Sequence, residues 1–362
     1  MIRLTELKLP LSALPVETRR AADAPSETEA DRAPTAHPLA TLTRLSAQAL
    51  GIAPEAIAGL QVFKRSFDAR KAELLAVFIV DITLQDPAQE AGLLARWSGH
   101  PHIGATPDMA YPLPGVAAAP PAPRPVVVGF GPCGMFAALL LAQMGLRPLL
   151  LERGQPVKQR SADTFGFWRG SQPFDPESNA QFGEGGAGTF SDGKLYSQVS
   201  EDPRLVRKVL EELVAAGANA EILTLHRPHI GTFKLATVVR GLRAHVEALG
   251  GEVRFGCLVQ ELVLEPGLSR QVRGVKLASG EIITTDHVAF APGHSARDSF
   301  AALHRQGVAM QPKPFAIGVR IEHPQPLIDR ARWGAAAGHP RLGPAEYKLV
   351  HHIAGGRDVY SF

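Results

Sequence analysis

Residues 126–154 read VVVGFGPCGMFAALLLAQMGLRPLLLERG. An apolar run leads into three closely spaced glycines, Gly129, Gly131 and Gly134. A helix-like stretch follows, and a second apolar run then ends at Glu152. Strand, glycine-rich turn, helix, strand and acid, in this order, form the unit that binds dinucleotides in doubly wound α/β proteins. The stretch therefore predicts a nucleotide site on a parallel sheet.

Each position in this unit has a physical task. Gly129 permits the tight turn, Gly131 lets the backbone approach a pyrophosphate, and Gly134 lets the helix pack closely on the strand. The pyrophosphate would lie at the helix N-terminus, where free N–H groups and the positive end of the dipole attract an anion. Glu152 stands 18 residues after Gly134, where its carboxylate accepts hydrogen bonds from ribose hydroxyls and disfavours the 2′-phosphate of NADP. These residues alone leave NAD and FAD as alternatives.

A second glycine-rich stretch decides between them. Residues 176–195 read PESNAQFGEGGAGTFSDGKL, with five glycines between Gly183 and Gly193. A flavin requires this second close approach of backbone, to the pyrophosphate and to the edge of the ring, and glycine allows it best. The interleaved Phe182 and Phe190 argue against a solvated linker. The pair of loops therefore favours FAD.

These stretches carry a family resemblance. Residues 124–200 resemble the flavoproteins with two dinucleotide-binding motifs, and NAQFGEGGAGTFSDGKL is similar to the uncharacterised bacterial FAD-dependent dehydrogenase family. The similarity extends to KRSFDARK at 64–71, GHSARDSF at 293–300 and KPFAIGVRIEHPQPLID at 313–329. It implies FAD binding and an oxidoreductase-like fold. The cofactor contacts that we expect from it and from the motifs are Gly129, Gly131, Pro132, Gly134, Glu152, Arg153, Gly183, Gly185, Gly186, Ala187, Gly188, Thr189, Asp192, Lys194, Val259 and Gly293.

The fold class that we predict is α/β, with a Rossmann-like FAD-binding domain, a discontinuous substrate or cap domain and a small N-terminal α/β domain. Alternation at 2–9, an amphipathic pattern at 39–50 closed by Gly51, and two β-rich runs build the N-terminal domain. GVKLASGEIITTDHVAFAPG (274–293) predicts a hairpin and then a buried strand. The expected division is an N-terminal domain at 1–100, a Pro/Ala-rich linker at 101–124, an FAD-binding domain at 125–200 and 246–310, and a substrate or cap domain at 201–245 and 311–362 that is incomplete at its C-terminus.

The function that we expect is an FAD-dependent oxidoreductase, which passes hydride or electrons through the flavin to a small-molecule substrate. NAD(P)H is an optional transient donor. A histidine or lysine at the flavin edge could move a proton, but each candidate also has a simple structural interpretation at a helix start or strand end. The weak catalytic candidates are Lys194, His294, Asp298, Glu322, His323, His351 and His352.

The amino-acid composition argues against several other classes of protein. The 362 residues, 45% of them hydrophobic, are enough for more than one core. A net charge of +3, with 38 basic against 35 acidic residues, gives no strong case for nucleic acid. Cys133 and Cys257 are far apart and form no CxxC pair, which argues against a disulfide framework or a zinc site. The few, separate cysteines suit a reducing cytoplasm, and we predict a cytoplasmic protein. No metal-ligand spacing is present, so we predict no metal. Neither a signal peptide nor a membrane span is recognisable, so we predict no membrane partner; the oligomeric state stays open.

Two alternatives remain. APGHSARD loosely matches an element of flavin-dependent monooxygenases. The charges of Lys64, Arg65, Arg70 and Lys71 would suit a flavin-fold module that associates with RNA. The simpler interpretation of this cluster is a solvated edge strand protected by charge.

Overall fold

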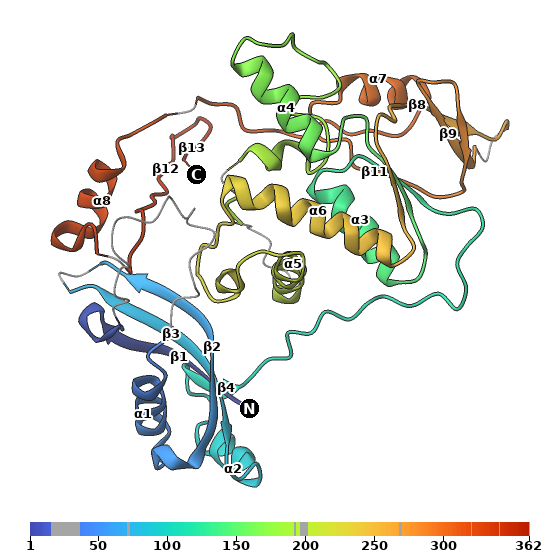
Figure 1. The fold of residues 1–362 in the computed structure, drawn as a ribbon. Helices are drawn as coiled ribbons and strands as arrows, with labels where there is room; N and C mark the ends of the chain where they lie inside the picture. Colours follow the sequence, from blue (N-terminus) through green and yellow to red (C-terminus); the bar gives the residue numbers. More distant parts are fainter. Residues whose placement is uncertain are drawn as a thin grey trace.

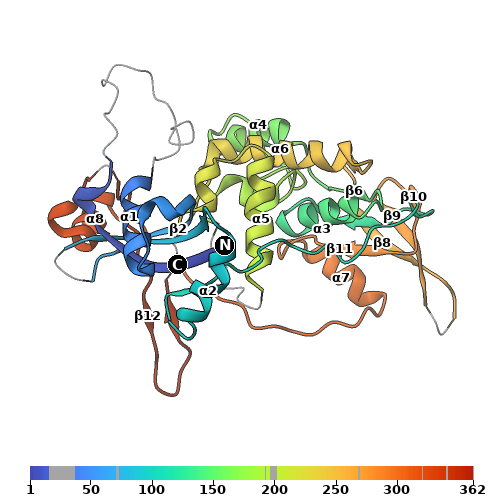
Figure 2. The ribbon, with the colours of Figure 1, turned by 90° about the horizontal axis from the view of Figure 1, so that it is seen from below.

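The computed structural model describes residues 1–15, 37–70, 73–191, 193–195, 202–267, 270–319, 321–339 and 341–361. The predicted cofactor residue Asp192 and Lys71 of the charge cluster lie outside these ranges. The described chain is a mixed α/β protein with a parallel sheet, as the sequence predicts. Figures 1 and 2 show its N-terminal domain beside a larger part that contains this sheet.

The N-terminal domain is an antiparallel sheet of order β2-β3-β1-β4, covered by a helix. Its strands are β1 (Ile2–Pro10), β2 (Ile57–Asp68), β3 (Leu75–Leu84) and β4 (Ile103–Ala105). Helix α1 (Leu39–Leu50) ends at Gly51, whose φ of 68° is left-handed, as the sequence predicts. Because β4 pairs with β1, the sheet extends past the predicted boundary at residue 100.

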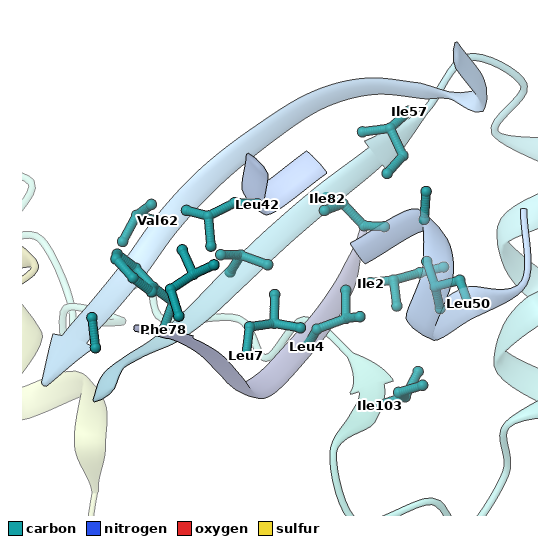
Figure 3. Packing of buried hydrophobic residues seen from close by; sticks show 14 of the residues in the cluster. Ile2, Leu4, Leu7, Leu42, Leu50, Ile57, Val62, Phe78, Ile82 and Ile103 are labelled. Atoms are coloured by element: carbon teal, nitrogen blue, oxygen red, sulfur yellow. The ribbon is translucent and has the colours of Figure 1, made fainter. Parts of the chain in front are cut away.

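A single apolar core holds this domain together. Leu42 and Leu50 of α1 pack onto Ile2, Phe78 and Ile82 of the sheet (Figure 3). The predicted alternation along β1 is interrupted by a bulge between Leu4 and Leu7, which inserts one extra residue. Because of this extra residue, Leu7 and Leu9 face the core, as Leu4 does before the bulge.

The larger part has three layers. Its central parallel sheet has the order β11-β5-β6-β7, from Val288–Phe290, Val126–Val128, Leu149–Leu151 and Glu252–Arg254. Strands β5 and β6 are completely buried, which explains their continuous apolar sequences. The predicted strand before Gly293 is β11, but its Ala289 is exposed because β11 lies at the edge of the sheet.

Helices cover one face of the parallel sheet and an antiparallel sheet covers the other (Figure 1). On the first face, α3 (Pro132–Gln143) packs against α6 (Thr232–Ala248), and α5 (Pro203–Ala215) joins the same core. On the second face lie β8 (Val259–Leu264), β9 (Val272–Leu277) and β10 (Ile282–Thr284). The predicted hairpin in this region is confirmed as β9 and β10.

The remaining elements are short. They are α2 (Ala88–Arg96), α4 (Val157–Trp168), α7 (Arg297–Arg305), α8 (Gln325–Trp333), β12 (Val350–His351) and β13 (Val359–Tyr360), with 3-10 helices at Leu11–Ala13, Pro54–Ala56, Gly186–Phe190, Ala220–Leu223 and Gly334–Ala336. Among the described residues, no helix has the length and apolar character needed to cross a membrane.

The two segments predicted to form a cap are placed differently. Residues 201–245 contain α5 and most of α6, whose apolar faces are buried in the core shared with α3 rather than in a separate domain. In the segment 311–362, Trp333 and Leu342 pack onto the core of the N-terminal domain. Burial of apolar side chains on the nearest existing core accounts for both placements.

Residues 315–319 of the C-terminal segment have the pattern of a strand but pair with no strand in the part of the chain that the structure describes. Phe315, Ile317 and Val319 alternate along the chain and are 81%, 90% and 93% exposed. The apolar side chains of the hairpin formed by β12 and β13 are also exposed. Alternating apolar side chains normally cover one face of a sheet.

Candidate functional site

The candidate site lies where the parallel strands end. Strand β5 runs into Gly129, whose φ is 98° and where an added Cβ would lie 2.3 Å from the carbonyl oxygen of Ala291, just after β11. An added Cβ at Gly134 would lie 1.8 Å from the carbonyl oxygen of Gly129. Real Cβ contacts are not this short, so both positions require glycine for the reasons that the motif predicts.

The start of α3 forms the first wall of the site. Gly131 is the residue before the helix, and Pro132 is its first residue, where the missing N–H of proline is not needed. Pro132 and Cys133 are exposed. The first N–H groups of a helix have no intrahelical acceptor and carry the positive end of the dipole. This exposed helix start can therefore bind an anion.

The second glycine-rich loop packs directly on the first. Gly185 and Gly186 have φ values of 85° and 59°, and the N–H of Gly185 donates to the carbonyl oxygen of Phe130 at 2.8 Å. An added Cβ at Gly186 would lie 2.7 Å from Cα of Gly131. The structure thus brings together two glycine-rich loops that are about fifty residues apart in the sequence.

Glu152 joins these two loops. Its side chain is 4% exposed. One carboxylate oxygen accepts from the N–H of Phe130 at 2.6 Å, and the other accepts from those of Gly154 and Gly183, both at 2.8 Å. A carboxylate offers about four acceptor positions, so one remains for a ribose hydroxyl. The ribose contact stays a prediction, whereas the link between the loops was not expected from the sequence.

Arg160 is a residue that the sequence did not single out. It lies on α4 with its side chain fully buried. Its guanidinium donates to the carbonyl oxygens of Asn179 at 2.8 Å, Ala180 at 3.0 Å and Glu184 at 2.7 Å. Burial lowers the pKa of Arg160 to about 10, although the carboxylates of Glu152 and Glu184 oppose this. Arg160 fixes the backbone that leads into the second glycine-rich loop.

Glu184 stands inside this loop, between two of its glycines, and is completely buried. One of its oxygens accepts from the N–H of Val157 at 2.6 Å, at the start of α4. The other lies 3.0 Å from Nε of Arg243, an ion pair without the angle of a hydrogen bond. Burial raises the pKa of the Glu184 carboxyl, only partly offset by the Val157 N–H and Arg243.

The raised pKa of Glu184 predicts a pH effect on stability. The folded chain binds a proton here more tightly than the unfolded chain, so this contribution is complete below the ordinary pKa of 4.5 and is lost as the pH rises through the folded pKa. Glu184→Gln removes the titration. The stability of Glu184→Gln relative to wild type should therefore increase as the pH rises. Denaturant unfolding of both proteins from pH 4 to 8 measures the difference; a constant or falling difference would contradict the expectation.

Arg153, a predicted cofactor contact, is engaged within the protein. Its guanidinium binds Glu177 at 2.7 Å and Asp298 at 3.0 Å, and lies 4.1 Å from the ring centre of Phe182. Partial burial alone would raise the pKa of Asp298, but the bond from Arg153 and backbone N–H groups bring it below the ordinary value. The structure therefore gives Asp298 the role of an ion-pair partner.

The other predicted residues divide into two groups. The turn after β11 meets the second loop, since Ser295 donates to Gln181 at 2.8 Å, and this places Gly293 and the exposed His294 near that loop. Lys194 lies at the loop's end, while Val259 is buried at the start of β8.

The second group is in the C-terminal segment. There His323 is hydrogen-bonded to Tyr347 at 2.7 Å and His352 to Asp358 at 2.8 Å. Glu322 and His351 lie in the same segment.

Comparison with known families gives two partial matches. Residues 314–362 match the family described as FAD-dependent protein, C-terminal domain-like. Residues 1–83 match a domain of unknown function, DUF8436. An uncharacterised protein of Clostridium beijerinckii is 39% identical over 319 residues, which cover 86% of this chain and 57% of that protein. The chain thus spans less than two thirds of the length of this relative.

Similar solved structures include the THI4 protein of Thermovibrio ammonificans, with 17% identity and a TM-score of 0.35 over 52% of this chain and 63% of that one. Another is the L-amino acid deaminase of Proteus vulgaris, with 16% identity and a TM-score of 0.27 over 54% of this chain and 52% of that one. TM-scores this low do not establish a common fold. The family match at 314–362 therefore remains the relevant link to FAD.

Proposed function

We propose that this protein is an FAD-dependent oxidoreductase that acts on a small-molecule substrate. One observation carries the proposal: two glycine-rich loops meet at the carboxyl end of the parallel sheet, at Gly131 and Gly186. The carboxylate of Glu152 accepts a hydrogen bond from each loop, from the N–H groups of Phe130 and Gly183. Ligands of open α/β sheets bind at this edge. The match of residues 314–362 to an FAD-dependent family supports the same cofactor.

The residues of the site fit FAD. The exposed start of α3 after Gly131 would bind the pyrophosphate, and the remaining acceptor position of Glu152 would bind a ribose hydroxyl. The loop at 183–188 would approach the ring, and the backbone at Val259 would face the adenine. FAD, when bound, supplies hydride and electron transfer.

The chain's own groups would orient the substrate and move its proton. His294 and Lys194 are exposed beside the second loop and are the proposed proton carriers. NAD(P)H as electron donor and the cytoplasm as location belong to the same proposal.

Anaerobic reduction of the reconstituted protein tests this function. We expect added FAD to stay bound through gel filtration and its absorbance to bleach with NADH, NADPH or a substrate from an oxidisable-metabolite panel, and to return with an electron acceptor. His294→Ala, at an exposed position, should retain FAD while slowing the bleaching at least tenfold. Bound flavin that no donor reduces would contradict the oxidoreductase, and protein that stays colourless would contradict the flavoprotein.

A further inference from the structure

Strand β2 of the N-terminal domain contacts the larger part of the protein. Strand β2 is at the edge of its sheet, and Arg65 on it is buried. The N–H of Arg65 donates to the carbonyl oxygen of Thr224 at 2.6 Å, and its own carbonyl oxygen accepts from His226 at 3.0 Å. Its guanidinium lies 3.0 Å from Glu221. Residues 224–226 thus form a short parallel pairing with the free edge of β2.

This pairing corrects the expectation of a solvated, charge-protected edge. Arg65 is paired with Glu221, and Arg70 is paired with Asp68 at 2.7 Å. Burial lowers the pKa of Lys64, which lies next to the pairing. The described part of the charge cluster is thus used in contacts within the chain, which favours a structural role over RNA binding.

The segment that follows Thr224 also pairs with the end of the second glycine-rich loop. The N–H of Leu195 donates to the carbonyl oxygen of Pro228 at 2.8 Å, and the N–H of Ile230 donates to that of Gly193 at 3.0 Å. Residues 224–230 therefore form a connector, which pairs with β2 at one end and with the last residues of the loop at the other. Gly193 has a φ of 72° and is packed against Leu235 of α6, so its position is narrowly defined.

A connector of seven residues with hydrogen bonds at both ends has little freedom to absorb a displacement. Loss of the Arg65 side chain removes the ion pair with Glu221 and leaves the two backbone hydrogen bonds to residues 224–226 without this anchor. The pairing at 228–230 then loses part of the support that fixes it. Coupling between two sites can be carried by a continuous chain of packed and hydrogen-bonded groups, and the connector provides one.

We propose that the N-terminal domain positions the end of the second glycine-rich loop through this connector, with Arg65 as the positioning residue. The inference rests on the proposed function, because the loop is there assigned to FAD. Docking of the N-terminal domain would then raise FAD affinity without any contact between that domain and the cofactor. This gives the N-terminal domain, which matches a domain of unknown function, a task in the proposed enzyme.

Amide hydrogen exchange and FAD titration of the full chain test the proposal together. Arg65→Ala should speed exchange at the N–H groups of Leu195 and Ile230 about tenfold and weaken FAD binding about tenfold, as expected for loss of one charged hydrogen bond. Glu221→Gln, which keeps the packing of Arg65, should act in the same direction but less. Arg70→Ala is the matched control, because Arg70 is an exposed arginine of the same region whose ion pair within the described residues is the local one with Asp68, and it should change neither quantity.

Faster exchange at His226 in Arg65→Ala, with Leu195, Ile230 and FAD affinity unchanged, would overturn the proposal. If Arg65→Ala does not fold, Glu221→Gln decides by the same two measurements. Failure of the wild-type chain to bind FAD would refute the proposed function instead, and the exchange rates at Leu195 and Ile230 would still decide whether the connector couples the two parts.

Discussion

Glu152→Ala is expected to lower the free energy of unfolding by about 3–5 kcal/mol, because three buried N–H groups lose a charged acceptor. These groups belong to the turn after β5, the turn after β6 and the second glycine-rich loop, at Phe130, Gly154 and Gly183. Loss of the carboxylate should therefore separate the two loops as well as remove the proposed ribose contact. Denaturant unfolding gives the first effect, and FAD titration of the folded fraction gives the second.

Glu152→Gln separates these contributions. Its amide oxygen can still accept from one or two of the N–H groups, but its NH2 group meets donors, so an intermediate loss of stability is expected. A Glu152→Ala variant with the stability of wild type would contradict the role of Glu152 as the link between the loops. Normal FAD affinity in that variant would in addition show that no ribose contact is made.

Gly134→Ala is expected to have the second large effect, a loss of about 3 kcal/mol. The added methyl group would lie 1.8 Å from the carbonyl oxygen of Gly129, so α3 must move away from β5. This displacement also moves the helix start that we assign to the pyrophosphate. Thermal unfolding and FAD titration of the variant measure both consequences.

Gly92→Ala is the matched control, because Gly92 lies in α2 and an added Cβ there has no neighbour within 4 Å. It should be neutral or stabilise the protein by about 0.5–1 kcal/mol, the usual gain for alanine within a helix. Equal behaviour of the two alanine variants would show that the close packing of α3 on the turn is not needed.

The elements that the sequence predicts correctly are those with a local cause. A glycine that must adopt positive φ or allow close packing, as at Gly51, Gly129 and Gly134, is recognisable beside its strand or helix. The apolar runs of β5 and β6 identify buried parallel strands for the same reason. These elements indicate the α/β class and the position of the first turn, and the local turn sequence within 274–293 indicates the hairpin of β9 and β10.

The residues that the sequence did not identify depend on distant partners. Arg160 and Glu184 are single charges in unremarkable surroundings, and their importance comes from burial against segments about twenty or more residues away. The division of the chain into domains also depends on distant partners. The amphipathic patterns of α5 and α6 indicate that an apolar face is covered, but do not indicate which core covers it.

The most direct test of the FAD site is a fluorescence titration of the purified chain with FAD, and with NAD⁺ as the competing dinucleotide. The proposed site should saturate at one FAD per chain without competition by NAD⁺. Gly134→Ala should bind FAD at least tenfold more weakly, and Gly92→Ala should bind it as the wild type does. Saturable binding of NAD⁺ without binding of FAD, or FAD binding that is insensitive to Gly134→Ala, would contradict the proposed site.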